Sequence, residues 1–169
     1  MSAQPIAALF YPPDTDPTPV MAQFVRALQA RGVAVIGAIQ HDTGPRANCT
    51  MALELLPSGH LLPMSQYLGS GSNACRLDPA AMAEAGMAVQ AAIADGAELA
   101  VFNKFGSQEA LGDGLRDEMA AAVMAGIPLV TAVGERFVDA WTDFTGGSYD
   151  RLPCSAEAAL AWWDERHAA

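Results

Sequence analysis

The feature that most constrains the fold is the apolar run AELAVFNKFG at residues 97–106, which follows Asp95-Gly96. An uninterrupted apolar run between a helix end and a glycine-containing loop is typical of a strand buried on both faces of a parallel sheet. Lys104 is the only lysine of the chain and lies where this strand is expected to end. Because the carboxyl ends of parallel strands face the ligand crevice of an open α/β sheet, we expect Asn103, Lys104 and the loop that carries Glu109 to face a ligand.

Buried strands alternate with helices along the rest of the chain. Residues 5–11 and 33–40 are expected strands, and the helix between them begins at Asp16-Pro17, a capping residue followed by proline at the first helical position. We expect further helices that begin at residues 78, 112 and 155, and a further strand over 127–133. The pattern predicts an α/β fold over residues 1–169, a single domain with three layers and a mainly parallel sheet.

Residues 51–67 predict an antiparallel hairpin added at one edge of the sheet. Residues 51–56 and 60–67 are the expected strands, and Pro57-Ser58-Gly59 is the turn between them. Pro63 has no N–H group to donate, which favours an edge position for its strand.

Composition limits the kind of partner. The chain has 169 residues, a formal net charge of −10 and a pI near 4.5, which argues against nucleic acid or an anionic membrane as a partner of a basic surface. Any anion site must therefore be local. The N-terminus has no positively charged region and no apolar run approaches the length of a membrane span, so we expect a cytoplasmic protein. The three cysteines form no disulfide framework, so we expect reduced thiols.

The loop after the first strand bears on nucleotide hydrolysis. This is where a P-loop protein carries Gly-x-x-x-x-Gly-Lys-Ser/Thr to hold phosphates. Residues 11–19 contain neither glycine nor lysine, and Asp14 and Asp16 would repel phosphate. We therefore do not expect standard hydrolysis of nucleoside triphosphates.

Two short segments are candidate anion sites. Lys104 with Asn103 would hold an oxyanion at the strand end, the alternative being a lone surface lysine. Cys75-Arg76 precedes a helix N-terminus, which lowers the pKa of a thiol, and Arg76 could bind an oxyanion through two hydrogen bonds. The alternative is a loop thiol, with Arg76 paired to Asp78 or Glu84.

Other groups favour a structural interpretation. His41, Asp42 and Cys49 are close in sequence but lack the spacing of a metal site, so a solvated loop is favoured. Trp141, Phe144, Trp162 and Trp163 could stack on bases, but their spacing favours core packing or a dimer contact. We expect four methionines to fill the core from helix faces: Met82, Met87, Met119 and Met124.

Several runs together resemble a known family. They are the strand-end Gln40, Cys75-Arg76-Leu77-Asp78, Asn103-Lys104-Phe105-Gly106 followed by Glu109, and Gly126-Ile127-Pro128-Leu129-Val130. Over most of its length the chain resembles an uncharacterised bacterial family of P-loop-NTPase-like domains. That family is similar in layout to the thermophile-type nucleoside triphosphatases and to the accessory protein of molybdopterin-guanine dinucleotide synthesis.

The resemblance implies a P-loop-like topology and a role in molybdenum metabolism, because members tend to be encoded near molybdate-uptake and nitrogenase genes. In the active relatives an aspartate ends the strand that here ends in Asn103, and a glutamate follows, as Glu109 does here. An amide at that position removes the carboxylate that orders magnesium.

We therefore expect an accessory protein that binds a small anionic ligand, either a nucleotide or an oxyanion such as molybdate or tungstate. The expected ligand-binding residues are Lys104, Asn103, Arg76, Glu109, Gln40 and Cys75, and the sequence indicates no catalytic residue. An atypical nucleoside triphosphatase and a non-catalytic scaffold are the alternatives. A homo-oligomer is compatible with the pattern.

Overall fold

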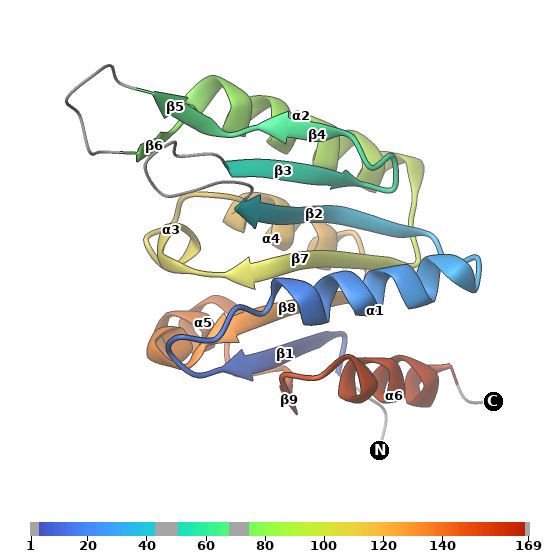
Figure 1. Cartoon of the computed structure of the whole chain (residues 1–169). Helices are drawn as coiled ribbons and strands as arrows, with labels where there is room; N and C mark the ends of the chain where they lie inside the picture. Colours follow the sequence, from blue (N-terminus) through green and yellow to red (C-terminus); the bar gives the residue numbers. More distant parts are fainter. Residues whose placement is uncertain (1–3, 43–50, 68–74, 168–169) are drawn as a thin grey trace.

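The computed structural model describes residues 4–42, 51–67 and 75–167. These residues form a seven-stranded sheet in the order β4-β3-β2-β7-β8-β1-β9, together with a separate pair, β5-β6 (Figure 1). From β2 to β9 neighbouring strands are parallel, whereas β3 and β4 are antiparallel to their neighbours. The strands are β1 (Ile6–Tyr11), β2 (Val35–Asp42), β3 (Met51–Leu56), β4 (Leu61–Pro63), β5 (Ser65–Tyr67), β6 (Cys75–Leu77), β7 (Leu99–Phe105), β8 (Leu129–Gly134) and β9 (Asp150–Pro153).

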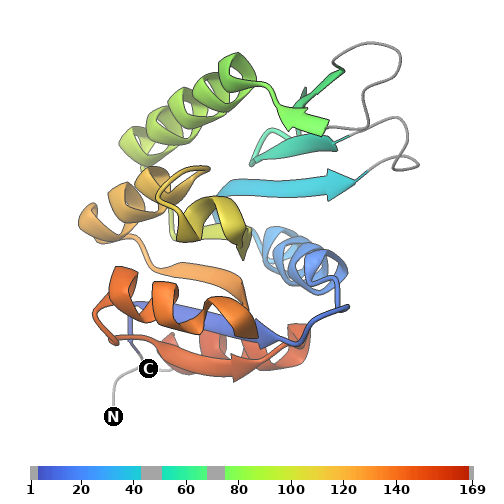
Figure 2. The ribbon, with the colours of Figure 1, turned by 90° about the vertical axis from the view of Figure 1, so that its left-hand side faces the viewer.

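Helices cover both faces of the sheet, so the fold has the three α/β layers that the sequence predicts, an arrangement consistent with a P-loop-like fold. Figure 2 shows α2, α4 and α5 on one side of the sheet and α1 on the other. Side chains of α1 and α6 pack in one core cluster, and those of α2, α4 and α5 pack in the second. The helices are α1 (Thr18–Ala30), α2 (Pro79–Asp95), α3 (Ser107–Ala110), α4 (Arg116–Met124), α5 (Val138–Thr145) and α6 (Ala156–Arg166), with the 3-10 helix η2 at Glu135–Phe137.

The central strands are apolar throughout because both of their faces are buried. In β1, Ala8 and Phe10 pack in the cluster under α5, while Ala7 and Leu9 pack in the cluster under α1. Leu99 to Phe102 of β7 are likewise buried. This two-sided burial removes the polar alternation of a surface strand, which is why the sequence pattern identifies these strands.

The predicted hairpin is correct in its first strand and turn and wrong in its second strand. Residues 60–67 do not form one strand: β4 pairs with β3, whereas β5 pairs with β6 in the two-stranded sheet. The chain changes partner at Met64, whose side chain is buried in the core and whose carbonyl accepts the N–H of Asp78. A buried anchor at this point divides the strand.

The tryptophans and methionines of the helices are not all buried, although the sequence predicts them as core residues. Trp141, Trp162 and Trp163 are buried, which confirms the core interpretation, and so is Met119. Met87 and Met124, in contrast, are 74% and 87% exposed, so their prediction as core residues is wrong.

The packing of α2 explains why Met87 faces outward. The buried face of α2 consists of Ala81, Ala85, Gly86 and Val89, and the Glu118 side chain of α4 lies directly against Gly86. Small residues bring α2 and α4 close together, which leaves no space for a methionine between them. None of the helices in the described part of the chain is long and apolar enough to span a membrane.

Candidate anion site

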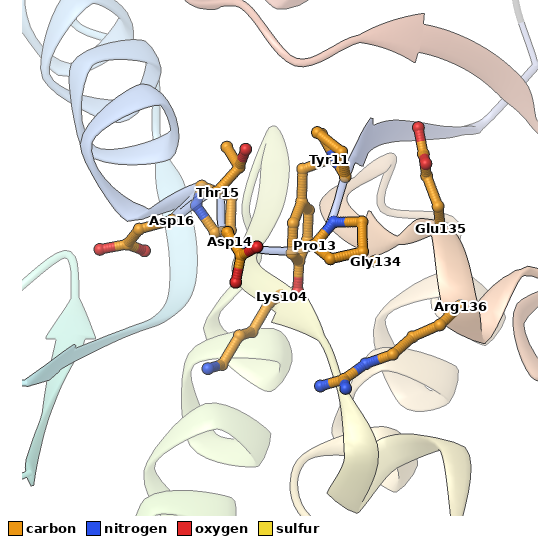
Figure 3. A pocket seen from close by; sticks show the side chains of 11 residues that line it. Tyr11, Pro13, Asp14, Thr15, Asp16, Lys104, Gly134, Glu135 and Arg136 are labelled. Carbon is orange, nitrogen blue, oxygen red and sulfur yellow. The ribbon is translucent and has the colours of Figure 1, made fainter.

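The carboxyl ends of β1, β7 and β8 open into a crevice, which Figure 3 shows from close by. Two cavities, of about 410 and 550 Å³, open there, and both are lined by Tyr11, Lys104 and Arg136. We call them the loop cavity and the helix cavity. The loop cavity extends over Pro12–Pro17, and the helix cavity extends over Gly106–Glu109.

Lys104 reaches the crevice through an irregularity in β7. Phe102 pairs with Thr131 of β8, and Phe105 pairs with Val133, so Asn103 and Lys104 together oppose a single residue of β8. An extra residue in one strand bends it and re-aims the side chains there. The bulge explains how Lys104 lines the crevice although its neighbours on both sides are buried in the sheet.

Arg136 brings a second cation from the next strand. It follows the end of β8 in η2, and its guanidinium lies over the Phe137 ring, 4.8 Å from the ring centre. In Figure 3 the guanidinium reaches toward the space beside Lys104, while Glu135 points away. Within the described residues, no ion pair involves Lys104 or Arg136.

Tyr11 ends β1 and lines both cavities together with the two cations. Its ring packs against Gly134, where an added Cβ would lie 3.4 Å from the tyrosine hydroxyl and 3.2 Å from the Phe137 ring. Burial raises the pKa of the Tyr11 hydroxyl, although the Arg136 guanidinium acts in the opposite direction. At neutral pH the side chain is therefore a neutral hydroxyl that can donate a hydrogen bond to an anion.

The loop after β1 is acidic, and one of its carboxylates binds a backbone N–H at the start of α1. Asp14 adopts a left-handed turn conformation with φ 68°. The helix begins at Thr18 and its N-cap is Pro17, so the prediction of Asp16 as the N-cap and Pro17 as the first helical residue is wrong by one position. Asp16 Oδ1 nevertheless accepts a 2.9 Å hydrogen bond from the Thr18 N–H. The protein's own carboxylate therefore occupies a helix N–H that a phosphate would use in a P-loop.

The Asn103 amide makes internal hydrogen bonds. Its Oδ1 accepts the Gln40 N–H at 2.8 Å, and its Nδ2 donates to the Gln40 carbonyl at 3.2 Å and to Thr18 Oγ1 at 3.0 Å. The pairing of β2 with β7 ends at Ala38 and Phe102, so the Asn103 amide continues the connection where the strands separate. The side chain is buried and has a structural role.

Glu109 also has an internal role. Its two carboxylate oxygens accept the N–H groups of Gly106 at 2.9 Å and Leu115 at 3.2 Å, which holds the loop around α3. Gln40 lines the helix cavity, and its Nε2 lies 3.3 Å from Met51 Sδ. The structure thus places Gln40 and Glu109 at the crevice, with Glu109 as a support.

Cys75 and Arg76 lie on β6, where they pair with Tyr67 and Gln66. The directions of their side chains lie outside the described structure, so their role in the site stays a prediction. The sequence suggests the loop that starts at Tyr11 as a partner of Lys104 in one pocket, and the structure places this loop and Lys104 in the loop cavity. Arg136 was missed. The rule that selected Lys104 applies equally to the residues after the strand at 127–133, and it could have found Arg136.

The metal interpretation of His41 has no support in the described part of the chain. His41 Nε2 lies 2.9 Å from Glu54 Oε1, and no group of three potential ligands is arranged around an ion position among the described residues. Cys49 and the Asp42 side chain lie outside the described residues. Cys154 is a free thiol, and burial raises its pKa.

Comparison with known proteins identifies the family. Residues 6–162 match the family described as "Protein of unknown function (DUF2478)". The chain belongs to this family. It is also 41% identical over 160 residues to the "Molybdenum import ATP-binding protein ModC 2" of Bradyrhizobium diazoefficiens. The alignment covers 94% of this chain and 18% of that relative, so the chain corresponds to a small part of the longer protein. No solved structure matches the chain.

Proposed function

We propose that this DUF2478 chain binds a small anionic ligand, an oxyanion or a nucleotide phosphate, between Lys104 and Arg136, as an accessory domain in molybdenum metabolism. One observation carries the proposal. Two cations from the ends of neighbouring parallel strands line the same two cavities, and within the described residues neither forms an ion pair.

Electrostatics support an anion at this position. Two like charges that share a cavity repel each other, and a bound anion would replace this repulsion with attraction. Lysine supplies a point charge, arginine supplies a planar pair of donors, and the Tyr11 hydroxyl adds a third kind of donor. Each hydrogen bond to a charged group contributes about 1.5–3 kcal/mol.

The relation to molybdenum rests on the relative. A protein whose name describes molybdenum import contains a segment 41% identical to this chain. Molybdate is a tetrahedral oxyanion, which suits a site built from a lysine, an arginine and a hydroxyl. We propose that the segment in the relative and the chain described here share the anion site.

The proposed function does not include standard hydrolysis of nucleoside triphosphates. The Asp16 carboxylate occupies the Thr18 N–H at the start of α1, and the Asn103 amide is used by Gln40 and Thr18. These are positions where a P-loop enzyme holds phosphate and orders magnesium.

The test is titration calorimetry with molybdate, tungstate and phosphate on the wild type, Lys104→Met and Arg136→Gln. We expect each variant to weaken the best anion by at least tenfold. Arg116→Gln is the matched control, because Arg116 also lies over a phenylalanine ring, that of Phe144 at 5.2 Å, but lines neither cavity. Its affinity should equal that of the wild type. Equal affinity in all four proteins would remove the two cations from the site, and absence of binding to the wild type would favour the scaffold alternative.

A further inference from the structure

The helix cavity is larger than a simple oxyanion needs. Its volume is about 550 Å³. A water molecule takes about 30 Å³ in the liquid, and a tetrahedral oxyanion has the size of only a few waters. Pockets of about 300–1,000 Å³ typically bind organic ligands. An anion held by Lys104 and Arg136 would therefore leave most of the helix cavity available to a group attached to it.

Part of the helix cavity is apolar, and the rest of its lining includes the polar side chains of Gln40, Ser107, Gln108 and Glu109. Met51, Met82 and Phe137 line it, and all three are partly buried against the core. Thioether and aromatic side chains make favourable contacts with flat rings. The amides of Gln40 and Gln108 line the same cavity and can pair with the polar edge of a heterocycle.

The anion position adjoins this apolar wall. The Arg136 guanidinium lies over the Phe137 ring, so the residue that would hold the anion contacts the residue that would hold the ring. The loop cavity on the other side carries Asp14 and Asp16 and would repel additional phosphate groups. The ligand should therefore extend into the helix cavity and carry a short anionic end.

We propose that the natural ligand is a phosphorylated planar heterocycle of the nucleoside monophosphate class. Its phosphate lies between Lys104 and Arg136, and its ring lies against Met82 and Phe137 in the helix cavity. The inference rests on the anion site proposed above and adds the chemical class of its ligand.

The experiment measures affinities for phosphate, AMP, GMP, UMP and flavin mononucleotide by titration calorimetry, with ATP for comparison. We expect at least one monophosphate to bind at least tenfold tighter than phosphate and no more weakly than ATP. Met82→Ser should weaken that monophosphate at least fivefold and leave phosphate unchanged, because Met82 contacts only the ring. Lys104→Met should weaken both.

The matched control is Met87→Ser, a change on the same helix at a side chain that is 74% exposed and lines neither cavity. It should leave every affinity unchanged. If Met82→Ser fails to fold, Gln108→Ala replaces it, because Gln108 is exposed and its truncation removes one polar partner of the ring.

The outcomes separate the two proposals. Equal affinity for phosphate and all monophosphates, with Lys104→Met weakening both, would overturn the ligand class and leave the anion site standing. A monophosphate whose affinity is unaffected by Met82→Ser and Gln108→Ala would also overturn it. If neither phosphate, molybdate nor any monophosphate binds the wild type, the anion site itself fails.

Discussion

Asn103 shows how one side chain can take the place of backbone pairing. Its amide has the same donor and acceptor groups as a peptide, and it connects β7 to Gln40 of β2 beyond the last backbone pair. It also donates to Thr18 at the start of α1. The next residue, Lys104, is thereby fixed at the edge of the crevice.

We predict that Asn103→Asp destabilises the fold by about 1–3 kcal/mol, the cost of leaving buried groups without partners. An aspartate can still accept the Gln40 N–H but cannot donate to the Gln40 carbonyl or to Thr18 Oγ1. Urea unfolding measures the change, and Thr18→Ser, which keeps the hydroxyl, is the control. An Asn103→Asp protein as stable as the wild type that gains magnesium-dependent nucleotide binding would contradict the structural role.

Glu118 gives a prediction about pH at the same scale. Burial raises the pKa of its carboxyl between α2 and α4, and its Oε2 has no hydrogen-bond partner among the described residues. A carboxyl with a raised pKa stabilises the fold fully below its unfolded pKa of about 4.5. This stabilisation is lost as the pH rises through the higher folded value.

We therefore expect Glu118→Gln to stabilise the protein at pH 7 and to have a smaller effect below about pH 4.5. Thermal unfolding at several pH values measures this difference. Glu84→Gln, at an exposed carboxylate of α2, should show no such pH-dependent gain. A Glu118→Gln protein that is less stable than the wild type at pH 7 would show that the charged form is favoured.

At the scale of elements, a group of charged side chains attaches the hairpin to the rest of the sheet. Glu54 of β3 accepts two hydrogen bonds from Arg26 of α1, at 3.1 and 3.2 Å, and lies 2.9 Å from His41 of β2. Burial by itself raises the pKa of the Glu54 carboxyl, but the two partners outweigh burial and hold the pKa below its usual value. The stabilisation of the fold by the ionised Glu54 carboxyl is present above about pH 4.5. It is lost as the pH falls through the folded pKa of Glu54.

We predict that Arg26→Met destabilises the protein by about 1–3 kcal/mol at pH 7 and by less at pH 3, because the stabilisation by the ionised Glu54 carboxyl falls as the pH drops toward and through its lowered folded pKa. Chemical unfolding at the two pH values tests this. Arg31→Met is the control, because Arg31 pairs with Asp164, and 46% and 57% of the two side chains are exposed. The same loss at both pH values would mean that Arg26 acts through packing of its stem.

The sequence predicts elements whose causes are local, and it fails where the cause is a distant residue. The strands at 5–11 and 97–106 follow from their own apolar runs. The role of Asn103 depends on Gln40 and Thr18, which are 63 and 85 positions away in sequence. The exposure of Met87 likewise depends on how closely α4 approaches, which no pattern within α2 indicates.

At the scale of the whole molecule, strand order decides which residues meet. The sheet places β7 and β8 side by side and β1 next to β8, so Lys104, Arg136 and Tyr11 come together although they lie in separate segments. Strand order follows from the packing of all helices and cannot be read from one segment. The sequence therefore predicts the end of the sheet at which the candidate site lies and one of the two cations that line it.

The same arrangement predicts that the molecule does not hydrolyse ATP or GTP with magnesium. The sheet brings Asp14 and Asp16, rather than glycines and a lysine, to the place above β1, and Asp16 already holds the Thr18 N–H. A phosphoryl transfer enzyme needs donors and a metal at that place to neutralise charge that develops on the phosphate. The wild type should release no more phosphate from ATP or GTP than the Lys104→Met variant does. Both should equal a blank that is purified in the same way. Turnover above the blank that Lys104→Met abolishes would contradict this prediction and establish the atypical triphosphatase, because only a lysine that contacts the reacting phosphate would produce that difference.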